Sequence, residues 1–224
     1  YIFDLIEFIE IGSLPKQPGH IPKISFAIEK SILNKVLKHT PLGHILNMGT
    51  YVVYCHRIAS YFVKATDFIP YFWNEKEGQK RSDDYKIYKA DTIDNQQTLK
   101  CILNSGIFYY CWHVYNDGYH CGKATIENYR LNMPLQRKLQ ISLNNLSAKL
   151  TEDYKSNCNR RETTYKTTGK VIYDEFYPKH SKPIIDEIDR VLAQHYGFTD
   201  EEFDFIINYD IKYRMGRESE GIEN

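Results

Sequence analysis

The sequence lacks the features that mark membrane proteins, disulfide-rich secreted proteins and common nucleotide-binding enzymes. No apolar run approaches the ~18–20 residues of a membrane-spanning helix, and no signal peptide is visible. The five cysteines have no paired spacing, which argues against a disulfide framework and favours a reducing cytoplasm. The phosphate-binding patterns G-x-G-x-x-G and G-x4-G-K-[ST] are missing, and so is the G-x-S-x-G motif. We therefore expect a cytoplasmic protein without a membrane partner.

The chain is electrically balanced as a whole but not along its length. Its 224 residues carry 29 basic and 29 acidic side chains, and 42% of them are hydrophobic, a composition typical of one or two globular domains. Residues 120–182 carry 12 basic and 6 acidic groups, whereas residues 183–224 carry 4 and 11. The asymmetry indicates either an anionic partner for the basic middle or two oppositely charged segments that face each other in the fold.

Hydrophobic periodicity predicts an α+β protein. Apolar residues at helical spacing predict helices over residues 23–39, 94–112 and 135–152. Short strands are expected at Tyr51–Tyr54 and Tyr61–Ala65, and residues 74–91 are expected to form a long loop or an exposed hairpin. We expect an irregular, mixed β-containing region framed by long helices, with short strands of mixed direction.

The last fifty residues predict a C-terminal helical pair. Pro183 begins the first helix and Gly197 ends it. Thr199 and Glu202 form a capping box at the start of the second. Before this pair, residues 154–174 have no apolar period and are expected to be a loop or a weak hairpin.

Four potential metal ligands lie close together in the sequence, Cys111, His113, His120 and Cys121. Their spacing matches no standard zinc pattern, so buried, hydrogen-bonded side chains are the simpler interpretation. A nucleophilic cysteine is defined by geometry and stays open as an alternative, such as a Cys-dependent hydrolase, but no local signature supports it.

The signals for binding are stronger than those for catalysis. The basic segment carries Lys155, Arg160, Arg161, Lys166 and Lys170, interleaved with Tyr154 and Tyr165. Such side chains bind phosphates or base edges. A solvated surface loop is the alternative. A second candidate group is Arg57 and Lys64 near Tyr54 and His56, for which the alternative is an aromatic core edge with Arg57 in an ion pair. The third is the turn Asn116–His120, for which a turn without a recognition role is the alternative.

Several segments resemble adenine-N6 DNA methyltransferases of type II and type IIG restriction–modification systems. The run Asn208-Tyr-Asp-Ile-Lys-Tyr-Arg-Met-Gly216 resembles their extreme C-terminus, as does the run from Tyr173 to Asp189. Upstream, Ile69–Phe72, Ser82–Lys86, Leu103–Ser105 with Phe108-Tyr109, and Asp117–His120 resemble the family's TaqI-like specificity region. The likeness runs from about Ile21 to Gly216.

This resemblance implies a target-recognition domain that binds double-stranded DNA. In such proteins a separate N-terminal methyltransferase domain binds S-adenosylmethionine and carries an Asn-Pro-Pro-Tyr-type motif, which this sequence lacks. The chain is therefore expected to be non-catalytic and to hold no cofactor, while its parent methylates adenine and in some members also cleaves DNA. The resemblance adds Ser82 to the candidate DNA-binding residues, beside Asp117 and His120.

The sequence starts in mid-pattern at Tyr1, which favours an excised C-terminal piece of a larger protein. We expect residues 1–22 to be a linker or the tail of the catalytic domain, 23–153 the recognition region, 154–174 a basic loop and 175–224 a helical segment. The competing hypothesis is a structural or protein-interaction module that packs on the catalytic domain or on a partner subunit.

Overall fold

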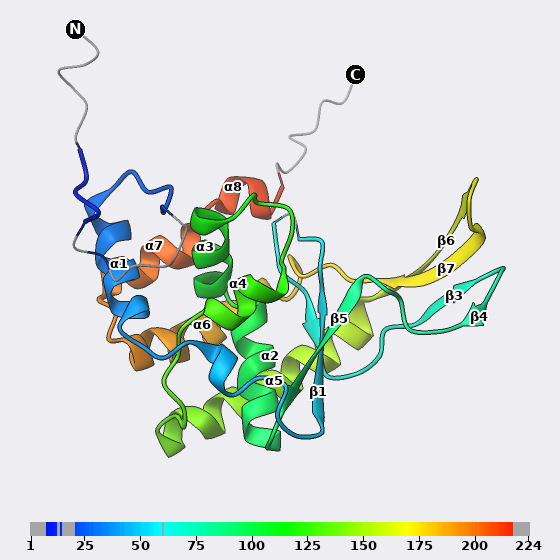
Figure 1. The fold of residues 1–224 in the computed structure, drawn as a ribbon, viewed down its shortest axis with the longest axis horizontal. Coiled ribbons are helices and arrows are strands. Elements are labelled where there is room, and N and C mark those ends of the chain that lie inside the picture. Colours follow the sequence, from blue (N-terminus) through cyan, green and yellow to red (C-terminus); the bar gives the residue numbers. More distant parts are fainter. Residues whose placement is uncertain (1–7, 13, 15–20, 60, 217–224) are drawn as a thin grey trace, which may run out of the picture.

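Helices form one side of the molecule and antiparallel strands the other (Figure 1). The computed structural model describes residues 8–12, 14, 21–59 and 61–216, so most of the expected segment 1–22 lies outside the described residues. The described helices are α1 (Ala27–Leu37), the 3-10 helix η2 (Leu42–His44), α2 (Ile93–Asn104), α3 (Gly106–Tyr115), α4 (Lys123–Asn128), α5 (Arg137–Asn157), α6 (Lys182–Tyr196), α7 (Asp200–Asn208) and α8 (Ile211–Arg214). The strands are β1 (Tyr51–His56), β2 (Ala65–Thr66), β3 (Phe72–Asn74), β4 (Gly78–Gln79), β5 (Tyr85–Ala90), β6 (Asn159–Tyr165) and β7 (Gly169–Glu175). The predicted α+β class is confirmed.

The centre of the core is the continuous buried stretch from Thr98 to Trp112. The sequence predicts a single helix here, which is wrong, because the chain breaks between α2 and α3 at Ser105. The Ser105 side chain accepts a hydrogen bond from the N–H of Phe108 at 3.0 Å and so caps α3. Gly106 lets the Asp189 carboxylate approach, since a Cβ there would lie 2.7 Å from its oxygen.

A three-stranded sheet in the order β2-β1-β5 packs against α2. Asn104, at the end of α2, exchanges hydrogen bonds with the backbone of Ala65 at 2.9 and 3.2 Å. Tyr154, expected in a loop, lies in α5 and donates to Asn104 at 2.7 Å. The expected strand over Tyr61–Ala65 is mostly irregular, and only its last residue is in β2.

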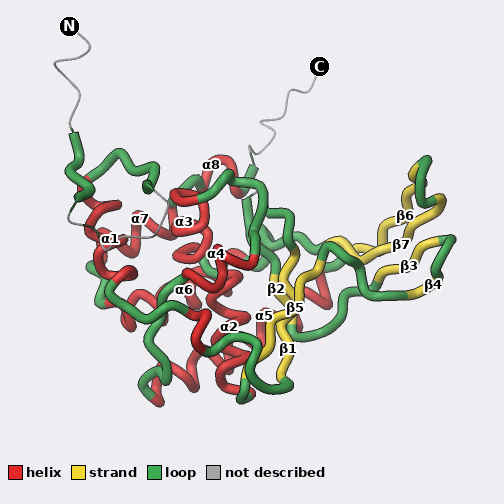
Figure 2. Tube along the Cα trace, viewed as in Figure 1, coloured by secondary structure: helices red, strands yellow, loops and turns green. Residues whose placement is uncertain are grey.

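A second sheet projects from the helical body as an arm, defined here as strands β3, β4, β6 and β7 with their turns (Figure 2). Its order is β4-β3-β7-β6, and every pairing in both sheets is antiparallel. The expectation of mixed strand directions is therefore wrong; tight turns impose antiparallel pairing on β3–β4 and β6–β7, and the pairings between distant strands, such as β1–β5 and β3–β7, are antiparallel as well. Residues 154–174, expected to be a loop or a weak hairpin, consist of the end of α5 and the β6–β7 hairpin, so the hairpin alternative is the one observed.

The C-terminal helical pair is confirmed. Pro183 lies in the first turn of α6, and Gly197 ends this helix in the left-handed conformation at φ 69°. Thr199 and Glu202 form the expected capping box at the start of α7. None of the described helices is both long and apolar enough to cross a membrane.

Candidate nucleic-acid interface

The arm is a sheet whose two faces both meet solvent. No residue of β6 is buried, and only Val171 is buried in β7. The two hairpins are joined at their tips, where Lys76 donates from Nζ to the carbonyl of Thr167. Glu75 accepts from the backbone N–H of Lys170 at 3.0 Å. The polar side chains of this sheet are therefore available to another molecule.

Arg160 lies on one face of the arm and is held in a fixed orientation. Its Nε donates to Asp174, its direct neighbour across the hairpin, at 2.6 Å. The guanidinium carbon lies 3.7 Å from the centre of the Tyr71 ring. The side chain remains 53% exposed, so the pairing with Asp174 and the stacking on Tyr71 do not cover it.

Arg161 lies on the opposite face, because successive side chains alternate along a strand. Its Nε donates to Glu175 at 2.7 Å, and a terminal nitrogen donates to the Tyr177 hydroxyl at 3.0 Å. The Tyr177 hydroxyl also donates to Glu175. Hydrogen bonds from Tyr177 and Arg161 hold the pKa of Glu175 below its ordinary value, although burial opposes this. Glu175 is therefore ionised at neutral pH.

A cleft of about 370 Å³ separates the arm from the sheet β2-β1-β5. Lys64 and Ser82, both predicted from the sequence, line it together with His56. Burial lowers the pKa of Lys64, and the nearby charge of Glu175 opposes that shift. The walls are largely aromatic and include Tyr71, Phe72, Tyr85, Tyr165, Tyr173 and Phe176. The cleft therefore combines flat apolar surfaces with charged groups.

Arg57 lies beside this cleft, just after β1. Its Nε donates to Asp84 at 2.8 Å, and Asp84 lines the cleft. This pairing agrees with the ion pair that was the alternative interpretation of Arg57. The backbone carbonyl of Arg57 accepts from the N–H of Cys121 at 2.8 Å, which brings the third predicted group close to the first two.

Hydrogen bonds between its own residues stabilise the turn with Asp117 and His120. Asp117 accepts from the backbone N–H of Tyr119 at 2.9 Å and of His120 at 2.8 Å, and its second oxygen lies 2.7 Å from Nδ1 of His120. Hydrogen bonds from His120 hold the pKa of Asp117 well below its usual range. An antiparallel bridge between Ile58 and His120 fixes the turn beside the end of β1.

Lys155 and Lys166 lie away from the cleft. Lys155 is on α5, with its Nζ 4.8 Å from the centre of the Phe68 ring, and it lines a different groove of about 610 Å³ between α2 and α5. Lys166 lies in the turn between β6 and β7, at the far end of the arm (Figure 1). The basic segment is thus divided between the body and the arm.

The four potential metal ligands do not converge. Within the described residues, no group of three or more His, Cys, Asp or Glu side chains is placed to hold a metal ion. His113 contacts the Tyr209 hydroxyl at 2.9 Å through Nδ1, whereas His120 is occupied by Asp117. Cys111 and Cys121 are buried and free, and burial raises the pKa of the Cys111 thiol to about 12. A thiol with so high a pKa is a poor nucleophile at neutral pH.

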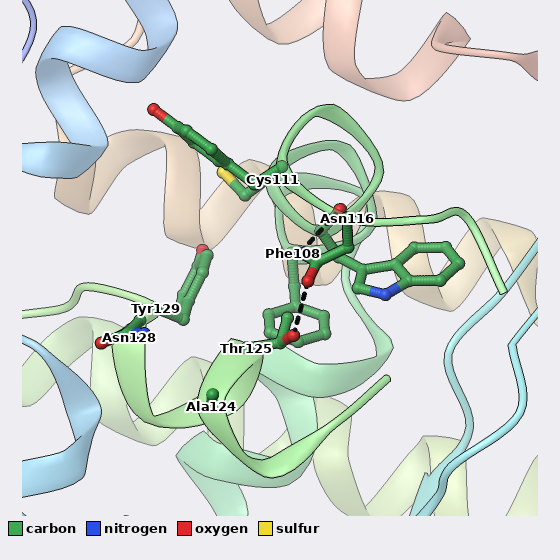
Figure 3. Close-up of a pocket in the computed structure, with 9 residues that line it drawn as sticks. Phe108, Cys111, Asn116, Ala124, Thr125, Asn128 and Tyr129 are labelled. Atoms are coloured by element: carbon green, nitrogen blue, oxygen red, sulfur yellow. Dashed lines mark hydrogen bonds between the residues drawn. The ribbon is translucent and has the colours of Figure 1, made fainter. Parts of the chain in front are cut away.

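A small cavity beside Cys111 reaches the surface, because Ala124 and Asn128 in its lining are exposed. It lies between α3 and α4 and has a volume of about 70 Å³. Figure 3 shows Thr125 directed at Asn116, and its hydroxyl donates to the Asn116 amide oxygen at 3.0 Å. The amide nitrogen of Asn116 donates in turn to the carbonyl of Trp112 at 3.0 Å. The hydrogen-bonding capacity of these polar groups is therefore met within the protein.

Sequence reasoning missed the carboxylates that hold the arginines, Asp84, Asp174 and Glu175. The available signal was charge alternation across a hairpin. Val171-Ile172-Tyr173 and the threonines of residues 163–164 favour strands, and pairing these strands places Arg160 opposite Asp174.

Comparisons of the chain with protein-family models, with curated proteins and with solved structures found no match. Function must therefore be argued from the geometry of the arm and the cleft, together with the sequence motifs.

Proposed function

We propose that this chain is a double-stranded DNA recognition module whose arm and neighbouring cleft contact the duplex. One observation carries the proposal: Arg57, Arg160 and Arg161 are each held through Nε by a carboxylate that lines the cleft. Among the described residues, the terminal nitrogens of Arg57 and Arg160 have no hydrogen-bond partner. Such a fork binds a phosphate, or the O6 and N7 edge of guanine, through two hydrogen bonds.

The carboxylate partners prepare the arginines for binding. A free arginine loses side-chain entropy when it is fixed against a ligand, and an arginine already held in place loses less. The same carboxylates reduce the net charge of the arm, so we expect moderate affinity. Lys166, at the tip of the arm, has no ion pair among the described residues and is available to a phosphate.

The motif resemblance extends this proposal to a methyltransferase of a restriction–modification system. The chain would position a target adenine, and a catalytic domain outside it would bind S-adenosylmethionine and transfer the methyl group. The adenine must leave the base stack, because its amino group is unreachable inside the duplex. The chain's own task would be to hold the flanking duplex, with no catalytic step of its own.

The test is a titration of the chain into fluorescent duplexes of random sequence at low and then moderate salt. We expect binding that falls steeply with added salt, since phosphate contacts release counterions. The triple variant Arg160→Ala/Arg161→Ala/Lys166→Ala should bind several-fold more weakly at each salt concentration. If the variant binds duplex as tightly as the unmodified chain does, the arm is not the contact surface.

A second candidate function, packing against another protein, is favoured by exposed apolar side chains. Phe8, Ile21 and Phe26 are all exposed. All three precede α1 in the chain, and α1 lies on the opposite side of the molecule from the arm (Figure 1). The two functions are compatible, because they use opposite ends of the molecule. If no duplex binds at any salt concentration while a methyltransferase domain does, packing becomes the main function.

A further inference from the structure

A second cavity, of about 250 Å³, adjoins the cleft, since His56, Lys64 and Phe176 line both. We call it the Arg214 pocket; it is lined by His56, Ile58, Tyr61, Phe62, Lys64, Phe176, Tyr177, Pro178, Lys179 and Arg214. Three of these side chains are cationic, and no carboxylate is among the described residues that line it. Its charge is therefore of one sign, unlike that of the cleft.

Arg214 is the least expected of these cations, because it is only 3% exposed. Its Nε donates to the backbone carbonyl of Tyr61 at 3.0 Å. The guanidinium lies between two rings, 4.4 Å from the centres of both Phe62 and Tyr109. Its two terminal nitrogens are buried and have no hydrogen-bond partner among the described residues. Native structures rarely leave buried charged donors without an acceptor, so each such case needs an explanation.

The nearest buried carboxylate does not supply that acceptor. Asp189 accepts from the backbone N–H groups of Gly106 and Ile107 at 2.8 and 3.0 Å, one at each oxygen, and receives no hydrogen bond from the terminal nitrogens of Arg214. Burial lowers the pKa of Arg214, and the charge of Asp189 opposes that shift. Because an arginine does not lose its proton in a protein, Arg214 stays cationic. The described residues supply no acceptor for it, and a bound group or water can do so.

Lys64 and Lys179 complete a set of donors suited to one chemical group. Lys64 is half-buried between the pocket and the cleft, and Lys179 is exposed at the pocket's edge. A planar guanidinium with two ammonium groups matches a tetrahedral oxyanion. A volume of about 250 Å³ has room for such a group and several waters, each of which takes about 30 Å³.

We propose that the Arg214 pocket binds a phosphate group of the DNA backbone next to the duplex held at the cleft. This inference rests on the proposed function, since it takes the phosphate from the same duplex. The pocket adjoins the cleft through Lys64, and Tyr177, which lines it, also accepts from Arg161 of the arm. One phosphate in the pocket therefore fixes the duplex relative to the arm.

The test uses the full chain and the variant Lys179→Gln, because Arg214 is buried and its replacement risks unfolding the protein. Lys149→Gln, on the exposed face of α5, is the matched control. In one experiment, inorganic phosphate replaces chloride at constant ionic strength and the melting temperature is measured. In the other, duplex affinity is measured against salt.

We expect phosphate to raise the melting temperature of the unmodified chain and of Lys149→Gln more than that of Lys179→Gln. We also expect Lys179→Gln to weaken duplex binding several-fold and to reduce the salt slope by about 0.9, the value of one phosphate contact.

The outcomes separate this inference from the proposed function. If the phosphate effect depends on Lys179 but duplex binding does not, the pocket takes free phosphate and the DNA source is overturned. If Lys179→Gln changes neither measurement while arm variants still weaken duplex binding, the pocket inference fails and the proposed function stands. If neither the unmodified chain nor any variant binds duplex, but phosphate still raises the melting temperature in a way that depends on Lys179, the proposed function fails and only the anion site remains.

Discussion

Replacing Lys100 with methionine removes the charged side chain that ties α2 to α5 and to the segment leading into the arm. Lys100 is 1% exposed. Its Nζ donates to Asp67 at 2.6 Å, to the carbonyl of Ser147 at 2.9 Å and to the Thr151 hydroxyl. Methionine fills a similar volume and makes none of these bonds. The variant therefore leaves Asp67 without its cation and the Ser147 carbonyl without this donor.

The size of the effect follows from burial. Breaking a buried ion pair on one side costs about 3–5 kcal/mol, because the remaining charge stays in a poorly solvated place. The Asp67 side chain is 18% exposed, so we expect the lower end, about 3 kcal/mol. Adding Asp67→Asn removes the remaining charge, and the double variant should recover about 1 kcal/mol of this loss.

Urea unfolding followed by circular dichroism measures these free energies, with Lys149→Met on the exposed face of α5 as control. Burial opposes ionisation of Asp67, but the hydrogen bond and charge of Lys100, with Thr151, together lower its pKa below the ordinary 3.8. The stabilisation is therefore complete above pH 3.8 and is lost as the pH falls through the lower folded-state pKa. The difference in unfolding free energy between the unmodified chain and Lys100→Met should therefore become smaller in acid. A loss under about 1 kcal/mol at pH 7, equal to that of the control, would refute the reasoning.

Three further substitutions test other parts of the fold by the same measurement. Gly49→Ala should lower the free energy of unfolding by about 2–4 kcal/mol, because φ is +95° and a Cβ would lie 2.4 Å from the carbonyl oxygen of Ala90. A decrease below about 0.5 kcal/mol would contradict this geometry. Asp189→Asn should lower the free energy of unfolding by about 2–4 kcal/mol, since the new amide nitrogen would face the N–H of Gly106 or of Ile107. An unchanged urea midpoint would show that these two hydrogen bonds are dispensable. Thr199→Ala should cost about 1 kcal/mol by removing the cap of α7, whereas Thr199→Ser should restore most of it.

Helices with an apolar stripe could be predicted because their signal is local. The stripe over 23–39 yields α1, and the proline, glycine and capping-box signals yield α6 and α7. The break at Ser105 could not be predicted in this way. It depends on Asp189, which lies 83 residues from Gly106 in the sequence and reaches the start of α3 only in the folded chain.

The hairpins of the arm could be predicted only as alternatives to loops, for a physical reason. Neither face of β6 is buried, so its residues carry no apolar alternation for a pattern search to find. The candidate site was predicted in part. Lys64 and Ser82 line the cleft, but the acids that hold Arg57 and Arg160 come from other segments and are defined only by tertiary contacts.

The most direct test of the account compares two arginines that differ in place and little else. Arg160 and Arg190 are 53% and 54% exposed, each pairs with a carboxylate through Nε, and each lies over an aromatic ring. Only Arg160 is on the arm, and Arg190 is on α6. The salt dependence of duplex binding should be measured for Arg160→Gln and Arg190→Gln. We predict weaker binding and a salt slope lower by about 0.9 for Arg160→Gln alone. Equal slopes for both variants and the parent would contradict the proposal that the arm contacts DNA.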